Sequence, residues 1–177
     1  MRVIAGTRGG RKLVAPDTSG TRPVADRVKE SLFSSIAADL PGAAVADLFA
    51  GAGSFGIEAL SRGAASAVFV ENGRKALDAL RTNLASLDLD GQVVRADVGT
   101  WTPHGEFDVV FCDPPWPMGR ADLEEILHRI APAVVANGLV VVTRRSSDEI
   151  PAPVGFRIDD ERAIGDARII RYRKETQ

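Results

Sequence analysis

Short apolar runs recur along the chain from residue 43 onward, and they alternate with longer stretches in which apolar residues are spaced three and four apart. Apolar runs bounded by turn residues indicate buried strands, and the longer spacing indicates helices with one apolar face. The predicted strands are residues 44–49, 67–71, 92–96, 107–112 and 139–143, and the predicted helices are residues 55–62, 74–86 and 123–135. This alternation predicts an α/β fold in which helices cover both faces of a mostly parallel sheet.

The carboxy-terminal stretch has a different pattern. After the proline-rich residues 151–153, two apolar segments with polar flanks, at 156–160 and 168–173, predict a hairpin that closes one edge of the sheet. With this hairpin, the sheet is expected to contain seven strands.

The amino-terminal stretch is predicted to form a separate small unit. Two β-prone pieces surround a glycine-rich turn and predict a short hairpin, and a helix is predicted at residues 25–38, where Pro41 and Gly42 end it. The chain therefore divides into an amino-terminal hairpin and helix, residues 1–42, and a main domain, residues 43–177.

Composition limits the class of protein. The 177 residues are 45% hydrophobic and 26% charged, as expected for one globular domain. The one cysteine, Cys112, lies in an apolar run, so no internal disulfide is possible and a reducing compartment is expected. No stretch reaches the length of a membrane span and no apolar signal-peptide core follows the first residues, so we predict a cytoplasmic protein.

Charge is unevenly distributed, although the net charge is only −2. The first sixteen residues contain no acid and four basic side chains, Arg2, Arg8, Arg11 and Lys12. Such a segment is suited to neutralising nucleic-acid phosphates, but a solvated basic arm explains it equally well.

The most informative local feature is Asp113-Pro114-Pro115-Trp116, which follows a predicted strand. Prolines stiffen the backbone at the point where the Asp113 carboxylate is presented. The carboxylate and the Pro114 carbonyl can only accept hydrogen bonds, so together they can hold both hydrogens of an amino group, while Trp116 stacks on the ring that carries it. We therefore expect a catalytic role for Asp113, Pro114 and Trp116, although a plain proline turn has the same sequence.

A second motif follows the first predicted strand of the main domain. Gly51, Gly53 and Gly56 have the spacing of the nucleotide-binding fingerprint between a strand and a helix. Glu71 ends the next strand, where it is placed to hold both ribose hydroxyls of a nucleoside. Asp97 follows the third strand and is a candidate for the adenine amine, although a turn cap is almost as good an interpretation.

The acidic residues expected at this edge of the sheet indicate which kind of nucleoside would bind there. Asp47, Glu71, Asp97 and Asp113 are expected at the same edge of the sheet, and the loop after the first strand has no basic residue to pair with a pyrophosphate. A cationic nucleoside without phosphate fits better, so S-adenosylmethionine is the predicted cofactor. No pair of histidines has metal-ligand spacing, so no metal is expected.

The motifs together resemble those of class I S-adenosylmethionine-dependent methyltransferases that modify exocyclic amines, and more narrowly those of the RsmD family. The resemblance is carried by residues 2–6, 10–13, 21–23, 26–33, 47–53, 60–64, 70–72 and 113–116, and it weakens after about residue 151. It implies a Rossmann-like methyltransferase fold and methyl transfer to N2 of one guanine in small-subunit ribosomal RNA.

The resemblance also implies roles for individual residues. Asp47, Phe49 and Asn72 join the glycines, Glu71 and Asp97 as candidate cofactor-binding residues, and Arg22 and Arg27 join the four basic residues above as candidate RNA-binding residues. The implied partner is small-subunit ribosomal RNA, as naked RNA or in an assembling 30S particle, and a monomer is expected. Trp116 departs from the tyrosine usual in the family, and Arg8 replaces a common aromatic residue.

Three alternatives remain open. A DNA adenine-N6 methyltransferase would use the same acceptors, but such enzymes usually carry a sizeable target-recognition region for which this chain has no room. A nicotinamide-dependent oxidoreductase shares the glycine spacing but gives no reason for the residues at 113–116. A non-catalytic RNA-binding module would not need the set of acidic residues at the cleft.

Overall fold

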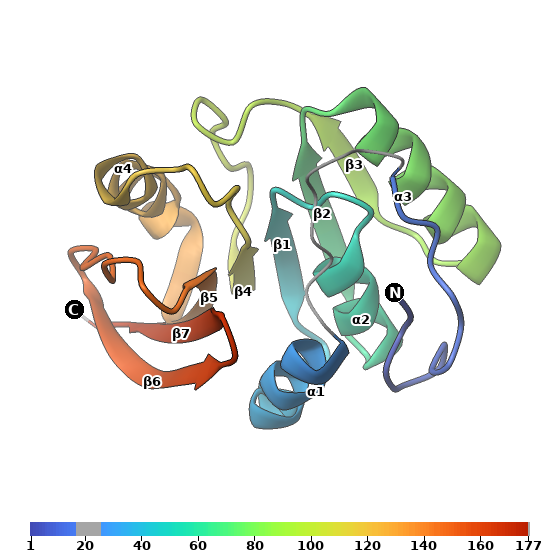
Figure 1. Cartoon of the computed structure of the whole chain (residues 1–177), viewed down its shortest axis with the longest axis horizontal. Helices are drawn as coiled ribbons and strands as arrows, with labels where there is room; N and C mark the ends of the chain where they lie inside the picture. The colour runs from blue at the N-terminus through green and yellow to red at the C-terminus, as the bar shows by residue number, and fades with distance from the viewer. Residues whose placement is uncertain (17–25, 177) are drawn as a thin grey trace.

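The computed structural model describes residues 1–16 and 26–176. Five strands are mutually parallel and two are antiparallel to their neighbours. The parallel strands are β1 (Ala44–Leu48), β2 (Ser66–Glu71), β3 (Gln92–Arg95), β4 (Phe107–Cys112) and β5 (Val134–Arg145); β6 (Phe156–Ile164) and β7 (Ala167–Lys174) form the carboxy-terminal hairpin. Together they make one sheet in the order β3-β2-β1-β4-β5-β7-β6 (Figure 1), which confirms the predicted seven-stranded, mostly parallel sheet.

Helices lie on both faces of this sheet, as predicted. The helices are α1 (Asp26–Ser35), α2 (Ser54–Ser61), α3 (Arg74–Leu87) and α4 (Arg120–Ile130). Alternate strand residues point to opposite faces. Val45, Val109 and Val141 pack in one hydrophobic cluster with α1, α2 and α3, whereas Ala46, Val110 and Val142 pack in a second cluster with α4.

The region after α4 differs from the prediction of a helix over residues 123–135. The α-helix ends at Ile130, a 3-10 turn covers Ala131–Ala133, and β5 begins at Val134. Pro132 has no N–H to continue the helical ladder, and the β-branched Val134 and Val135 favour the extended conformation. Strand β5 is consequently twelve residues long.

The amino-terminal segment packs into the first hydrophobic cluster. Its predicted strands reduce to a single antiparallel bridge between Arg2 and Lys12, and the predicted helix is α1 followed by the 3-10 turn Ala37–Asp39. Val3 and Leu13 are buried among side chains of α1, α2 and α3. The proposed division at residue 42 stays a prediction, and Ala25 and the 21–23 motif lie outside the described residues.

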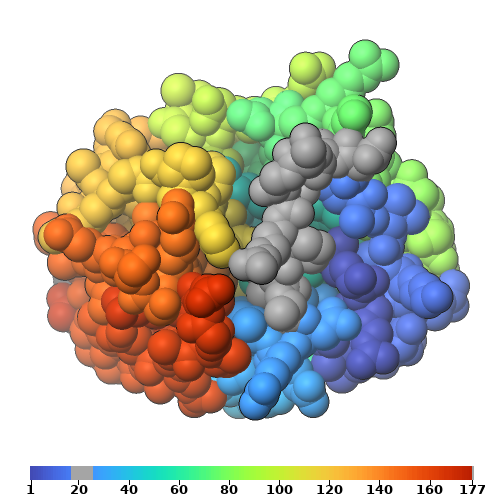
Figure 2. Space-filling model, viewed as in Figure 1, coloured from blue at the N-terminus to red at the C-terminus, as the bar shows by residue number. Residues whose placement is uncertain are grey.

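Figure 2 shows residues 1–16, in dark blue, at one end of the molecule and the red and orange carboxy-terminal hairpin at the other. Cys112 is buried in β4 with a free thiol. In residues 1–16 and 26–176 there is no helix with the length and apolar character needed to cross a membrane.

Candidate active site

The register of the parallel strands brings the predicted site residues to one edge of the sheet. Leu48 of β1 is paired with Val70 of β2 and with Cys112 of β4. Cys112 is in turn paired with Val142 of β5. The residues that follow these positions therefore lie side by side at this edge. Phe49 and Asp113 come just after their strands, Glu71 is the last residue of β2, and Thr143 lies within β5.

Asp113 is half-buried at the end of β4. The Thr143 hydroxyl donates a short hydrogen bond to its Oδ1. Burial raises the pKa of Asp113 to about 6, against the opposing effect of the Thr143 hydrogen bond. Asp113 is therefore an ionised acceptor at neutral pH, poised to take up a proton from a bound substrate.

Trp116 follows on the same loop and is 39% exposed. The guanidinium carbon of Arg145 lies 5.0 Å from the centroid of its ring. This is cation–π geometry, so Arg145 covers one face of the indole. A base that stacks on Trp116 must use the opposite face or displace Arg145.

Asp47 holds the start of α2. It is 1% exposed, and its Oδ2 accepts a hydrogen bond of 2.8 Å from the Gly56 N–H, which is one of the first-turn donors of α2. Its Oδ1 has no hydrogen-bond partner among the described residues. Burial raises the pKa of Asp47 to about 8, the Gly56 hydrogen bond opposes this, and the nearby charge of Asp113 adds to it.

The three glycines of the fingerprint occupy different surroundings. A Cβ on Gly53 would lie 2.4 Å from Leu80 Cδ1, and one on Gly56 would lie 2.3 Å from Phe69 Cε1, so both glycines are needed for packing. Among the residues that the structure describes, a Cβ on Gly51 would meet only the Phe49 carbonyl oxygen, at 4.0 Å. Gly51 therefore leaves the open space that a ligand needs.

Glu71 binds the glycine loop to the end of β2. Its Oε2 accepts a hydrogen bond of 2.9 Å from the Gly51 N–H. Its Oε1 accepts those of Asn72 and Gly73, at 3.0 and 2.7 Å. A carboxylate has about four acceptor sites, so Oε2 retains room for one more donor. The predicted contact with both ribose hydroxyls would require Gly51 to be released.

Asp97 is exposed and caps its own turn. Its Oδ1 accepts a hydrogen bond of 2.8 Å from Gly99, and its carbonyl accepts the N–H groups of Thr100 and Trp101. These contacts match the turn-cap interpretation. Contacts of Asp97 with adenine and of the exposed Asn72 with a cofactor remain predictions.

Two of the predicted RNA-binding cations bond to the carboxyl end of α3. Arg8 donates to the carbonyls of Leu87 and Asp88, at 2.6 and 3.2 Å, and Arg11 donates to the Ser86 carbonyl at 3.4 Å. Arginines at a helix C-terminus satisfy free carbonyls and complement the helix dipole.

The other predicted cations that the structure describes have fewer contacts. Arg2 pairs with Asp26 at 3.4 Å on the surface, and the side chains of Lys12 and Arg27 are exposed. Arg22 lies outside the described residues. RNA binding by any of these cations remains a prediction.

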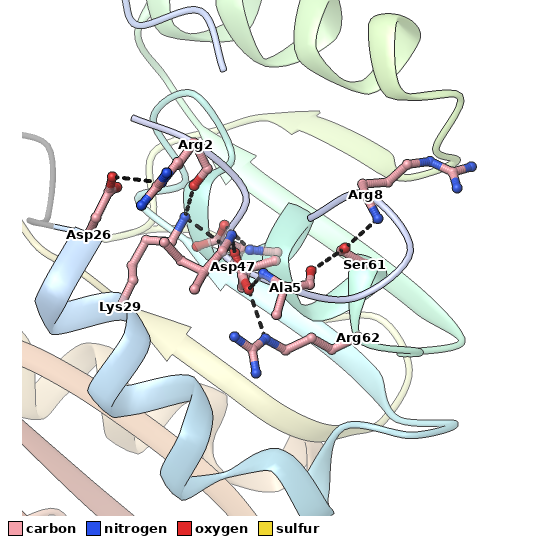
Figure 3. A network of polar contacts seen from close by, with 11 residues as sticks. Arg2, Ala5, Arg8, Asp26, Lys29, Asp47, Ser61 and Arg62 are labelled. Atoms are coloured by element: carbon pink, nitrogen blue, oxygen red, sulfur yellow. Dashed lines mark hydrogen bonds and ion pairs between the residues drawn. The ribbon is translucent and has the colours of Figure 1, made fainter. Parts of the chain in front are cut away.

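Sequence analysis missed a buried charged cluster that attaches the amino-terminal segment to α2. Glu58, fully buried, accepts hydrogen bonds from the N–H groups of Ile4 and Ala5 at 2.7 and 3.0 Å. Arg62 and Lys29 pair with the same carboxylate at 2.7 and 3.5 Å. Figure 3 shows the side chains of Lys29 and Arg62 extending into the same network of polar contacts, with the Arg8 guanidinium pointing away from it. The sequence feature that could have indicated this cluster is Glu58, the one charged residue in the mostly apolar helix α2.

Asn83 of α3 makes a second attachment, to the glycine loop. It is fully buried, and its Nδ2 donates to the carbonyls of Val14 and Ala52, each at 3.0 Å, while its Oδ1 accepts the Val14 N–H at 2.7 Å. One side chain thus joins the amino-terminal segment to the loop that follows β1.

The chain is similar in sequence to proteins of one known family. The model of the family described as Conserved hypothetical protein 95 matches residues 1–173. Ribosomal RNA small subunit methyltransferase D of Escherichia coli is 34% identical over 186 aligned residues, with 100% of this chain and 91% of the relative covered. The chain belongs to the RsmD family.

Other comparisons agree with RsmD-family membership. The Haemophilus influenzae protein of the same name is 33% identical, with 98% of this chain and 92% of the relative covered. A solved structure of the Escherichia coli protein yhhF superposes with a TM-score of 0.88 and 33% identity, covering 100% of this chain and 99% of that one. The predicted Rossmann-like methyltransferase fold and the predicted class of enzyme are therefore confirmed.

Proposed function

We propose that this RsmD-family chain transfers a methyl group from S-adenosylmethionine to the exocyclic N2 of a guanine in small-subunit ribosomal RNA. The observation that carries the proposal is the placement of Asp113, held by Thr143 and followed by Trp116, beside the glycine loop at one sheet edge. The names of the relatives, which are ribosomal RNA methyltransferases, support the substrate class.

The residues at the end of β1 and β2 suit S-adenosylmethionine. Gly51, with a φ of 56°, leaves open space above the loop, and Glu71 retains acceptor capacity for a ribose hydroxyl. The edge carries Glu71 and Asp113, a negative environment that favours a cationic ligand. When bound, S-adenosylmethionine supplies an electrophilic methyl group on a positively charged sulfur.

The role of Asp113 and Pro114 is to prepare the amine. The lone pair of a guanine amine is delocalised into the ring, and the amine is a weak nucleophile. The Asp113 carboxylate and the Pro114 carbonyl accept its two hydrogens and hold the nitrogen in a geometry that frees the lone pair. Acceleration comes mainly from this positioning and from the electrostatics of the acceptors.

The methylated nitrogen carries one proton too many, and Asp113 accepts it directly or through water. With a pKa of about 6, Asp113 is ionised at neutral pH and available for this step. Trp116 holds the base by stacking. This stacking contributes about 1–3 kcal/mol of binding free energy, which offsets part of the free energy needed to remove the base from its own stack.

The proposal also covers the oligomeric state, the location in the cell and the form of the RNA substrate. We propose that the chain acts as a monomer in the cytoplasm and that the substrate is the RNA of an assembling 30S particle. Of the cations that the structure describes in the amino-terminal segment, Arg2, Arg8 and Arg11 already have partners within the protein, and the few that remain offer limited affinity for naked RNA at physiological salt.

The deciding experiment uses labelled S-adenosylmethionine with small ribosomal subunits from cells that lack this methyl group, alongside naked ribosomal RNA and DNA. We expect N2-methylguanosine after digestion of the subunits, and none with the Asp113→Ala variant. Label in N6-methyladenine of DNA, or no label in any substrate, would contradict the proposal.

A further inference from the structure

A cleft beside Trp116 plays no part in the mechanism described so far. It has a volume of about 360 Å³ and lies between residues 116–120, which lead into α4, and the end of β5 with the residues that follow it. Its charged lining consists of Arg120, Arg144, Arg145, Asp148 and Glu149.

Arg144 is the buried cation of this cleft, with only 6% exposure. Its Nη2 donates to the Met118 carbonyl at 2.7 Å and pairs with Asp148 at 3.0 Å. Its Nε and Nη1 have no hydrogen-bond partner among the described residues. A buried guanidinium with unused donors is costly unless another acceptor joins it, so Arg144 indicates a place for an anion.

The ion pairs of the cleft leave one of its arginines over. Arg120 pairs with Glu124 at 2.8 Å and with Glu149 at 3.3 Å, and Asp148 is taken by Arg144. Arg145 forms no ion pair within residues 1–16 and 26–176, and its Nε has no hydrogen-bond partner there. Of the three arginines that line the cleft, Arg145 is thus the one that makes no ion pair with a described carboxylate.

The start of α4 adds a third attractive element. Gly119, its N-cap, supplies no side-chain hydrogen bond to the first turn of this eleven-residue helix. Free N–H groups and the positive end of the helix dipole favour an anion at this position. Asp122 in the first turn opposes the effect, so the arginines provide the main attraction.

We propose that this cleft binds a backbone phosphate of the RNA strand next to the target base, an inference that rests on the proposed function. Guanidinium groups bind phosphate through paired hydrogen bonds. Trp116 lines the cleft and also belongs to the catalytic loop, so one phosphate and the stacked base would be held on two sides of one loop. The site would then fix the orientation of the nucleotide whose base meets Asp113.

The test replaces Arg145 by Gln and measures two quantities. We expect the KM for unmethylated small subunits to rise about tenfold, as for a lost charged contact of about 1.4 kcal/mol, with kcat within about twofold. For a mixed-sequence single-stranded RNA oligonucleotide, we expect the slope of log K against log salt to fall by about 0.7. Arg145→Lys, which keeps the charge but loses the paired donors, should recover part of both.

The matched control is Arg157→Gln, an exposed arginine on β6 that lies outside the cleft and pairs weakly with Asp159 at 3.7 Å. It should change neither quantity. Melting temperature and affinity for S-adenosylmethionine, measured for each variant, check the fold and the cofactor site, and both should match wild type.

Three results would overturn the inference: an unchanged KM and salt slope in Arg145→Gln, an equal change in Arg157→Gln, or a loss of S-adenosylmethionine affinity, which would assign the cleft to the cofactor. Failure of the proposed function is separate. It would appear as no N2-methylguanosine with wild-type protein, while the oligonucleotide slope would still report on the cleft.

Discussion

The neighbouring strands β1 and β4 end at the same edge of the sheet, yet the aspartates at their ends have different surroundings. Asp47 lies one residue before the end of β1 and is 1% exposed. Asp113 lies one residue after the end of β4 and is half-buried. Burial raises the pKa of both, to about 8 for Asp47 and about 6 for Asp113.

The hydrogen bonds of the two carboxylates explain the difference in role. Asp47 accepts a backbone N–H of α2 and so holds the glycine loop in shape. Asp113 accepts a hydrogen bond from the Thr143 hydroxyl and can accept further hydrogen bonds at the edge of the sheet. A shift of two residues along paired strands therefore separates a carboxylate that maintains the fold from one suited to chemistry.

The largest expected effect comes from removing the carboxylate after β4. Asp113→Ala should lower the rate of methyl transfer by about 10²–10³-fold, because the amine loses its principal acceptor. Asp113→Asn keeps one acceptor oxygen, so its rate of methyl transfer should lie between those of the wild type and of Asp113→Ala. Single-turnover transfer to unmethylated subunits measures the rates, and calorimetry measures cofactor affinity, which we expect to remain within about twofold. An equal loss of cofactor affinity would show that Asp113 belongs to the cofactor site instead.

A smaller effect, on stability, should follow from removing the carboxylate of β1. Asp47→Ala leaves the buried Gly56 N–H without an acceptor, and we expect the free energy of unfolding to fall by about 1–3 kcal/mol. Asp47→Asn preserves an acceptor and serves as the control, with a smaller loss. Urea unfolding at pH 6, where Asp47 is neutral in the folded protein, measures both. If the two variants lost equal stability, the Gly56 contact would not be the reason.

The smallest effect should be a displaced pH profile. Transfer requires ionised Asp113, so the rate should fall as the pH is lowered through about 6. The Thr143 hydrogen bond lowers the pKa of Asp113, so Thr143→Val should raise that pKa and move the acidic limb to higher pH. Thr143→Ser keeps the hydroxyl and should retain the wild-type profile. Rates measured from pH 5 to 9 test this, and a displacement in the serine variant would argue against the hydrogen bond as its cause.

Several features of the fold were predictable from local sequence. Period and length of the apolar segments identified all seven strands and four helices, because a strand buried on both faces is apolar throughout and a helix repeats every three to four residues. The prolines that follow Asp113 indicated that its carboxylate is presented at the end of a strand. The end of α4 was missed because Val134 and Val135 extend the apolar pattern past Pro132.

Contacts between distant segments could not be predicted in this way. Arg8 and Arg11 were interpreted from their charge alone, whereas the fold places the carboxyl end of α3 within their reach. Gly56 was assigned to ligand approach because its spacing fits the fingerprint, whereas Phe69 of β2 occupies the space that a side chain would need. Each case depends on which segment packs against which.

The sequence by itself determined the class of fold, and it predicted a cofactor loop and an acidic residue suited to catalysis, since periodicity and backbone restriction act over a few neighbouring residues. Only the tertiary structure decided that Thr143 would bond to Asp113, that Arg145 would cover Trp116, and that Asp47 would be committed to α2. Strand register and burial set these contacts, and both depend on segments far apart in the chain.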